Sequence, residues 1–331
     1  MVQFIANLHS FINYSYIGTA IILVCFYVIF KIRRDIAPNM KALAYFSAIA
    51  VPPVTYIVKH VILQQPCTIG FLPGGVQGSV ANAYNAICRI GSSVTDFLVP
   101  FFGITIAIGL AKSLITLLAC KRLVYRYGYV DEEVAPELIA ALKEIAALTG
   151  IKLPQIILTS NSNAQAFTFG VFKPVIVISD GVLSNLSAQE LADVLKHECA
   201  HIKRYDVPTN WLAVMLRDVS FFNPFTHIAF SLYMTAKEEA SDDVALQSGA
   251  NPYQYGATLI KMWRISKENV LMSLIFDSVS PDPGFLKSVS SFEERVARML
   301  DWPNNTAKPK YFRILLTLVL LFSIIILNLV C

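Results

Sequence analysis

Charged residues are scarce in this 331-residue sequence. Asp, Glu, Lys and Arg make up 15% of it and apolar residues 55%, whereas about 25% of the residues in a soluble domain are charged. The composition therefore argues against an ordinary soluble enzyme and favours a membrane protein. The formal net charge is only +4, and the basic residues lie beside apolar runs and not in a stripe, so we expect no nucleic acid partner.

Cysteines at the spacing of a zinc finger are also missing. The six cysteines include no C-x-x-C pair, which argues against a zinc site built from thiolates. Cys67 and Cys88 bracket the polar, nearly uncharged stretch 64–89 between two apolar runs. They are a candidate disulfide if that stretch faces an oxidising compartment, and two unrelated thiols remain the alternative.

No charged side chain occurs in residues 1–14, so the first apolar run lacks the positive start of a cleaved signal peptide. Four apolar runs are long enough to cross a membrane: 14–30, 42–63, 90–119 and 314–330. With four spans, the basic clusters all fall on one side, which the positive-inside rule assigns to the cytoplasm: 31–41, 121–126 and 308–313. We therefore expect a multi-pass protein of the cell (inner) membrane, with the loop 64–89 and both termini outside.

Histidine is rare as well, yet two of the five histidines lie in the pentapeptide H-E-C-A-H that begins at His197. On a helix, H-E-x-x-H places both imidazoles on one face, where His197 and His201 can bind one Zn²⁺ and Glu198 can take a proton from water. The helix itself is predicted locally, because Ser187 and Glu190 have the spacing of a capping box. We expect one zinc ion per chain and hydrolytic chemistry.

A candidate third zinc ligand follows in the acidic stretch 237–243, which reads K-E-E-A-S-D-D. On a helix Glu239 and Asp243 share a face. We therefore predict Glu239 as the ligand and Asp243 as the group that fixes a ligating imidazole through a hydrogen bond. Glu238 and Asp242 are the alternatives one residue earlier.

Three motifs in order resemble the membrane metallopeptidases of the BlaR/MecR type, the β-lactam sensor-transducers and their relatives. They read H-E-C-A-H-I-K-R-Y-D from His197, E-A-S-D-D-V-A-L from Glu239, and A-F-T-F-G-V-F-K-P from Ala166. The resemblance covers residues 120–300 in motif detail and the whole chain in topology. It implies a membrane zinc endopeptidase that cleaves a protein in the cytoplasm, such as a transcriptional repressor or the chain itself.

The resemblance also assigns roles outside the zinc ligands. It implies that an edge strand beside the metal binds extended substrate, with a purely structural hairpin as the alternative: Ala164, Gln165, Ala166, Phe167, Thr168 and Phe169. Gln165 and Phe167 are the residues whose N–H groups we expect to face the substrate. Arg295 is either an oxyanion or substrate contact or an ion-pair partner of the acidic cluster. No penicillin-binding domain follows the last apolar run, so we do not expect β-lactam sensing.

The predicted fold is an α+β membrane protein, with four transmembrane helices and a cytoplasmic gluzincin-like zinc metalloprotease domain of helices and a small β-sheet. Residues 1–120 hold three spans, 121–310 the zinc domain, and 311–331 the fourth span. Within the zinc domain we predict a helix over 131–148, strands over 153–158 and 171–178, a membrane-associated helical hairpin over 207–236, and helices over 251–265 and 292–300.

Two other functions share parts of this pattern. A membrane quality-control protease of the HtpX or CAAX type also combines H-E-x-x-H with a glutamate, although such proteases usually place His-Pro ahead of the last arginine, where this chain has Ser290-Ser291-Phe292. A signalling protein with only a structural zinc is the second alternative, and Glu198 argues against it because a structural site needs no base. The sequence predicts no particular oligomeric state.

Overall fold

The computed structural model describes residues 2–33, 36–63, 101, 103–267, 289–302 and 309–330. These residues form two compact units. The first comprises residues 1–110, 213–233 and 307–331, and the second comprises 111–212 and 234–306. The predicted loop 64–89 and the Cys67–Cys88 pair lie outside the described residues.

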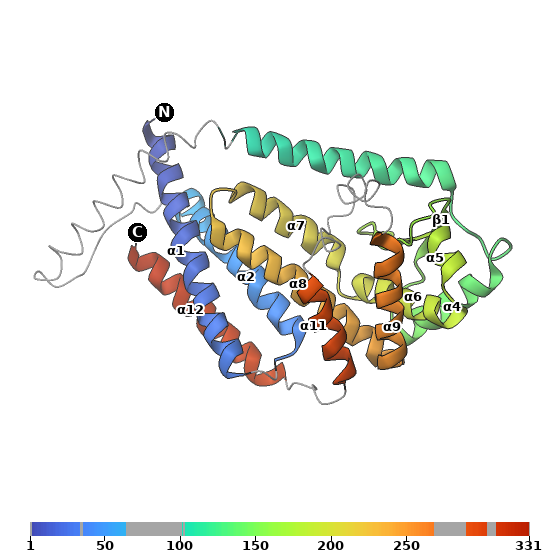
Figure 1. Cartoon of the computed structure of the whole chain (residues 1–331). Coiled ribbons are helices and arrows are strands. Elements are labelled where there is room, and N and C mark those ends of the chain that lie inside the picture. Colours follow the sequence, from blue (N-terminus) through green and yellow to red (C-terminus); the bar gives the residue numbers. More distant parts are fainter. Residues whose placement is uncertain are drawn as a thin grey trace, which may run out of the picture. The chain divides into compact units, whose positions relative to one another are not determined.

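Apolar helices build the first unit (Figure 1): α1 (Val2–Ile32), α2 (Pro38–Tyr56), which continues into a π-helix (Ile57–Ile62), and α12 (Pro309–Val330). All three contact one another. A Cβ on Gly18 of α1 would come within 2.9 Å of the Pro52 side chain and 3.1 Å of Leu327. The small residue therefore lets three backbones approach closely, as in other membrane helix bundles.

Three helices in the described part of the chain are long and apolar enough to span a membrane: Tyr14–Ile32, Pro38–Lys59 and Gly103–Tyr127. They correspond to the first three predicted spans. The helix over 103–127 runs past the basic pair Lys121-Arg122 and ends at Gly128, whose φ of 68° leaves the helical region. In α12 the described apolar stretch is shorter, Ile314–Ile325, so the fourth span stays a prediction.

A three-stranded sheet lies in the second unit: β1 (Gln155–Thr159), β2 (Ala166–Phe169) and β3 (Val175–Ser179). The order is β1-β3-β2, with β1 parallel and β2 antiparallel to β3. β2 is therefore an edge strand of this sheet. The prediction of one strand over 171–178 was wrong at its start, because Gly170 (φ 89°) opens a turn that separates β2 from β3.

Helices cover both faces of the sheet. Leu142 of α4 (Pro136–Thr149) and Leu195 of α6 (Ala188–Lys203) pack with Ile176 in one apolar core. On the other face, Val124 and Tyr127 from the end of the 103–127 helix pack against the sheet. The short helix α5 (Asp180–Asn185) follows β3. The zinc-binding motif is thus carried by a helix anchored on a buried sheet.

The predicted helix over 131–148 begins later than expected, at Pro136. A proline suits the first turn of a helix, where its missing N–H has no partner anyway. Asp131 to Val134 instead form a turn. Gly150, at φ 73°, ends the helix as predicted.

The predicted hairpin exists as α7 (Asp206–Val219) and α8 (Pro224–Gln247). α8 runs without a break through the acidic stretch 237–243, so the hairpin and the candidate third ligand share one helix. The remaining predicted helices are confirmed as α9 (Pro252–Lys267) and α11 (Val289–Leu300).

Candidate metal centre

The helix α6 presents the two histidines because its ends and its buried face are fixed. Its capping box is formed as predicted: the Ser187 N–H donates to Oε2 of Glu190 over 2.8 Å, and the Glu190 N–H donates to Oγ of Ser187 over 3.3 Å. Lys261 of α9 donates to Glu190 as well, over 2.8 Å. Leu195 is fully buried in the core, which turns His197 and His201 toward α8.

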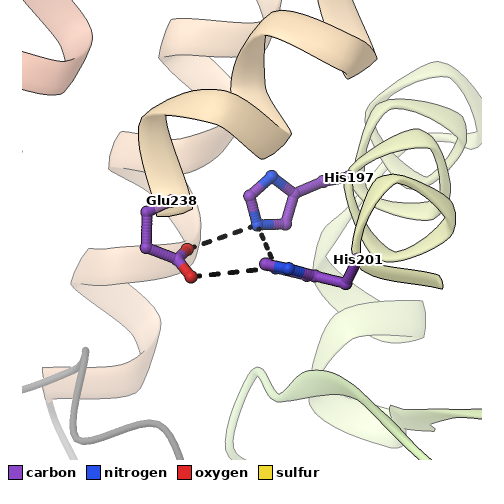
Figure 2. A group of neighbouring side chains, drawn as sticks. All are labelled: His197, His201 and Glu238. Atoms are coloured by element: carbon purple, nitrogen blue, oxygen red, sulfur yellow. Dashed lines mark hydrogen bonds and ion pairs between the residues drawn. The ribbon is translucent and has the colours of Figure 1, made fainter. Parts of the chain in front are cut away.

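Two imidazoles and one carboxylate converge on a single point (Figure 2). Nε2 of His197 lies 3.1 Å from Nε2 of His201 and 3.5 Å from Oε2 of Glu238, and Nε2 of His201 lies 3.8 Å from Oε1 of Glu238. Ligand atoms about 2.05 Å from a tetrahedral zinc would be about 3.3 Å apart. Within the described part of the chain, Oε1 of Glu238 is buried and accepts no hydrogen bond. The donor set therefore fits one Zn²⁺.

The predicted third ligand must be corrected from Glu239 to Glu238. Consecutive helical residues point about 100° apart, and the face of α8 that meets the histidines carries Glu238. Arg298 of α11 covers the neighbouring face, where its guanidinium donates to the Glu239 carbonyl over 2.7 Å and to Oδ1 of Asp243 over 2.6 Å. Asp243 is therefore an ion-pair partner of Arg298, and its predicted contact with a zinc-binding histidine is wrong.

Asp242 takes the place expected for Asp243. Its Oδ1 lies 3.2 Å from Nδ1 of His197 and accepts a 2.8 Å hydrogen bond from the Tyr255 hydroxyl, which itself lies 2.8 Å from Nδ1 of His197. Arg295 donates two 3.0 Å hydrogen bonds to Asp242 and lies 3.6 Å from Glu238. Of the two roles predicted for Arg295, the structure shows the ion pair.

His201 has a carboxylate partner of its own. Its Nδ1 lies 2.7 Å from Oδ2 of Asp206 and 3.1 Å from Oγ of Ser241. Arg204 donates to Asp206 over 3.2 Å. Each histidine thus has a carboxylate beside Nδ1, which leaves Nε2 for the metal and fixes the ring orientation.

One residue of the sheet contacts the side chain of Glu198. The Thr168 hydroxyl, on the edge strand β2, donates a 2.8 Å hydrogen bond to Oε2 of Glu198. Of the predicted substrate-binding stretch, only Ala166 to Phe169 forms β2. Ala164 is buried in the core, and Gln165 is held by Ser179, whose N–H donates to the Gln165 carbonyl over 3.0 Å.

Sequence reasoning missed the supporting residues Asp206, Ser241 and Tyr255, and it named Thr168 only as part of the substrate edge strand, without its contact with Glu198. Asp206 ends the quoted H-E-C-A-H-I-K-R-Y-D motif, which is the signal that could have found it. Tyr255 lies 58 positions from His197, and no local pattern connects the two.

Paired charges set the protonation of the site. Burial lowers the pKa of His197, but the carboxylates of Asp242 and Glu238 outweigh burial and raise that pKa to about 10. Burial raises the pKa of Asp242, yet Arg295 and His197 hold it well below its usual range. Without metal the cluster therefore keeps a proton on His197, and binding of a cation there releases it.

Comparison with known proteins agrees with this geometry. The profile of the family described as "BlaR1 peptidase M56" matches residues 20–277, which confirms the resemblance found in the sequence. The "Protease HtpX homolog" of Listeria innocua serovar 6a is 28% identical over 116 residues, which are 33% of this chain and 38% of that protein. The homolog of Streptococcus thermophilus is 29% identical over 89 residues, 26% of this chain and 30% of the relative.

The chain thus spans only about a third of the length of these curated relatives. Among solved structures, the crystal structure of S. mikatae Ste24p aligns at 14% identity and a TM-score of 0.34, covering 86% of this chain and 99% of that one.

Proposed function

We propose that the chain, which belongs to the BlaR1 peptidase M56 family of membrane zinc metallopeptidases, is an endopeptidase. Its protein substrate would be hydrolysed at the cluster of His197, His201 and Glu238. The observation that carries the proposal is the convergence of these three side chains next to Glu198. The match over residues 20–277 includes two complete candidate membrane spans, Pro38–Lys59 and Gly103–Tyr127, together with His197, Glu198, His201 and Glu238. The enzyme would therefore work as a multi-pass membrane protein.

His197, His201 and Glu238 would hold the zinc ion, which when bound polarises a carbonyl oxygen and lowers the pKa of water. Glu198 then acts as the general base that removes a proton from the attacking water and returns it to the leaving amine. Thr168 keeps the Glu198 carboxylate in place through its hydrogen bond to Oε2. Asp206 and Asp242 hold the imidazole rings so that both Nε2 atoms face the same point.

The edge strand β2 offers a place for extended substrate. Gln165 and Ser179 form a hydrogen-bonded pair across the β2–β3 ladder. Because such pairs alternate in antiparallel ladders, Phe167 also bonds to β3, and the N–H groups of Ala166 and Thr168 point to the free edge. A substrate paired there lies next to Glu198. The N–H groups of Gln165 and Phe167, which we expected to face the substrate, point toward β3 instead.

The proposal extends to regulatory proteolysis on the cytoplasmic side, of a transcriptional repressor or of the chain itself. The basic residues Lys31, Lys121 and Arg122 at the ends of candidate spans support this orientation. The resemblance to the β-lactam sensor-transducers supports a substrate protein that acts in signalling. The similarity to HtpX homologs favours a second candidate, membrane protein quality control. A purely structural zinc is disfavoured because such a site needs no base, whereas Glu198 follows His197 directly and its carboxylate accepts a hydrogen bond from Thr168.

The test is a comparison of wild type with Glu198→Ala, both purified as full-length protein and loaded with zinc. Wild type should cleave an unfolded protein such as casein, and the variant should not. Mapping of new N-termini in cells that express either form then separates the candidates. A single cleaved target indicates regulatory proteolysis, whereas many damaged membrane proteins indicate quality control. Equal cleavage by both forms in both assays would refute the proposed function.

A further inference from the structure

Residues 213–233, the part of the α7–α8 hairpin that belongs to the first unit, pack directly against the candidate span of α1. The Tyr16 hydroxyl donates a 2.6 Å hydrogen bond to the Phe222 carbonyl, and the Asn223 side-chain amide donates a buried 3.1 Å hydrogen bond to Oγ of Ser15. Ser15 and Tyr16 lie at the N-terminal end of the span that begins at Tyr14. The turn of the hairpin is therefore level with the N-terminal end of the candidate span Tyr14–Ile32, near the middle of α1.

Tyr233, at the other end of this segment, packs at a different depth along the candidate spans. The Tyr233 ring lies 5.7 Å from the Phe46 ring of α2. Phe46 lies eight residues after the start of the candidate span Pro38–Lys59, which is about 12 Å along that helix. Between Asn223 and Tyr233 the helix rises about 15 Å at about 1.5 Å per residue. That rise is about half of the ~30 Å hydrocarbon thickness of a bilayer.

The exposed face of this segment is mainly apolar; its exposed polar side chains are Ser231 and His227, whose Nε2 lies 3.0 Å from the Phe221 carbonyl oxygen. Exposed fractions of 36–51% occur at Met215, Phe225, Ile228 and Leu232. The two charged residues, Arg217 and Asp218, bond to each other over 2.6 Å, and the Arg217 guanidinium lies over the Phe230 ring at 4.5 Å. A face of this kind costs free energy in water and none against lipid.

The backbone of the segment also suits a membrane. Hydrocarbon tolerates a turn only where its polar groups are bonded within the protein. The Phe222 carbonyl accepts from Tyr16, the Asn223 N–H donates to the Ser220 carbonyl over 2.9 Å, and the Phe225 N–H donates to Oδ1 of Asn223 over 3.0 Å. The turn thus carries its own hydrogen-bond partners.

We infer that the hairpin enters the bilayer beside α1 and α2. Its turn reaches the end of these spans opposite Lys31, and the face formed by Met215, Phe225, Ile228 and Leu232 contacts lipid acyl chains. Lipid is the occupant because the face continues the surface of two helices that themselves have the length and composition of membrane spans. This inference goes beyond the proposed proteolysis and holds whether or not the chain cleaves a substrate.

Depth-resolved quenching of tryptophan fluorescence tests it in the full-length protein. The native residues Trp211, Trp263 and Trp302 are replaced by phenylalanine, and single tryptophans are introduced as Phe225→Trp or Leu232→Trp. Each protein is reconstituted into phosphatidylcholine–phosphatidylglycerol vesicles that carry bromine near the top or near the middle of the acyl chain. Tyr253→Trp, at an exposed position of α9, is the control outside the hairpin. Retained zinc content reports folding of each variant.

An inserted hairpin predicts a depth gradient. Bromine near the top of the chain should cause the larger loss of fluorescence for Phe225→Trp, and bromine near the middle the larger loss for Leu232→Trp, with little loss for Tyr253→Trp. Equal and shallow quenching at both hairpin positions would mean that the hairpin lies flat on the membrane and would overturn the inference. Tryptophans shielded from both bromine and aqueous iodide would show that a second copy covers the face, which overturns it too.

Discussion

The Thr168 hydroxyl donates a 2.8 Å hydrogen bond to the carboxylate of Glu198. A residue of the edge strand thus positions the base that we propose for hydrolysis. Thr168→Val removes this donor with little change in shape, so we expect kcat to fall by about tenfold, the worth of a hydrogen bond to a charged group. Thr168→Ser should restore most of the rate. Steady-state kinetics at constant zinc content give kcat for each variant. An unchanged kcat in Thr168→Val would exclude the positioning role.

Glu198→Ala should keep the zinc content and the thermal stability of wild type but lose peptidase activity. General acid–base catalysis contributes about 10²–10⁴-fold to the rate, so we expect the cleavage rate to fall by at least about 100-fold. Metal analysis and cleavage assays on the same preparation separate catalysis from folding. Activity close to wild type would contradict the mechanism.

Glu238→Ala should lose most of the bound zinc, because it removes one of three protein ligands. The matched control is Glu239→Ala, one residue along the same helix, whose side chain lies outside the cluster. Zinc per chain, measured by atomic emission after dialysis, decides between them. The sequence-based assignment of Glu239 would return if the two variants behaved in the reverse way.

Tyr255→Phe removes the hydroxyl that bonds to Asp242 beside His197 while it keeps the ring. Loss of such a supporting contact lowers metal affinity by about 10–100-fold in other zinc sites, and we expect the same order here. Tyr253→Phe, at an exposed position on the same helix, is the control. Competition with a chromogenic chelator gives both affinities, and equal values would remove Tyr255 from the metal site.

Proline substitution tests the substrate edge. Ala166→Pro removes an N–H that points away from β3, so the sheet should persist while KM for a protein substrate rises. Phe167→Pro removes an N–H that bonds to β3 and should lower the stability of the fold instead. Circular dichroism and cleavage assays on both variants distinguish the effects. An unaltered KM in a folded Ala166→Pro protein would move substrate recognition away from β2.

Features encoded by neighbouring residues were predictable from the sequence. The capping box at Ser187, the i, i+4 pair of His197 and His201, and the stop at Gly150 each depend on contacts within a few positions, and each is present in the structure. The hairpin and the later helices also followed from prolines and apolar periodicity.

Features set by tertiary packing were not predictable. Both Glu238 with Asp242 and Glu239 with Asp243 have the same spacing, and only the rotation of α8 against α6 and α11 decides which pair meets the histidines. The role of Tyr255 depends on a contact between α9 and α6 that no periodicity encodes. The sequence alone could not show which N–H groups of β2 point to the free edge. That depends on the pairing register with β3, because a shift of one position exchanges the inner and outer N–H groups.

The ligands His201 and Glu238 stand at the two open ends of the α7–α8 hairpin. A metal ion shared by them closes the intervening chain into a ring, in the manner of a reversible crosslink. On the chain-entropy estimate used for disulfides, closing a ring of this length is worth about 4 kcal/mol. The ion that equips the enzyme for hydrolysis would thus also act as a clasp, and a cell short of zinc would hold a looser form of the chain, more open to degradation.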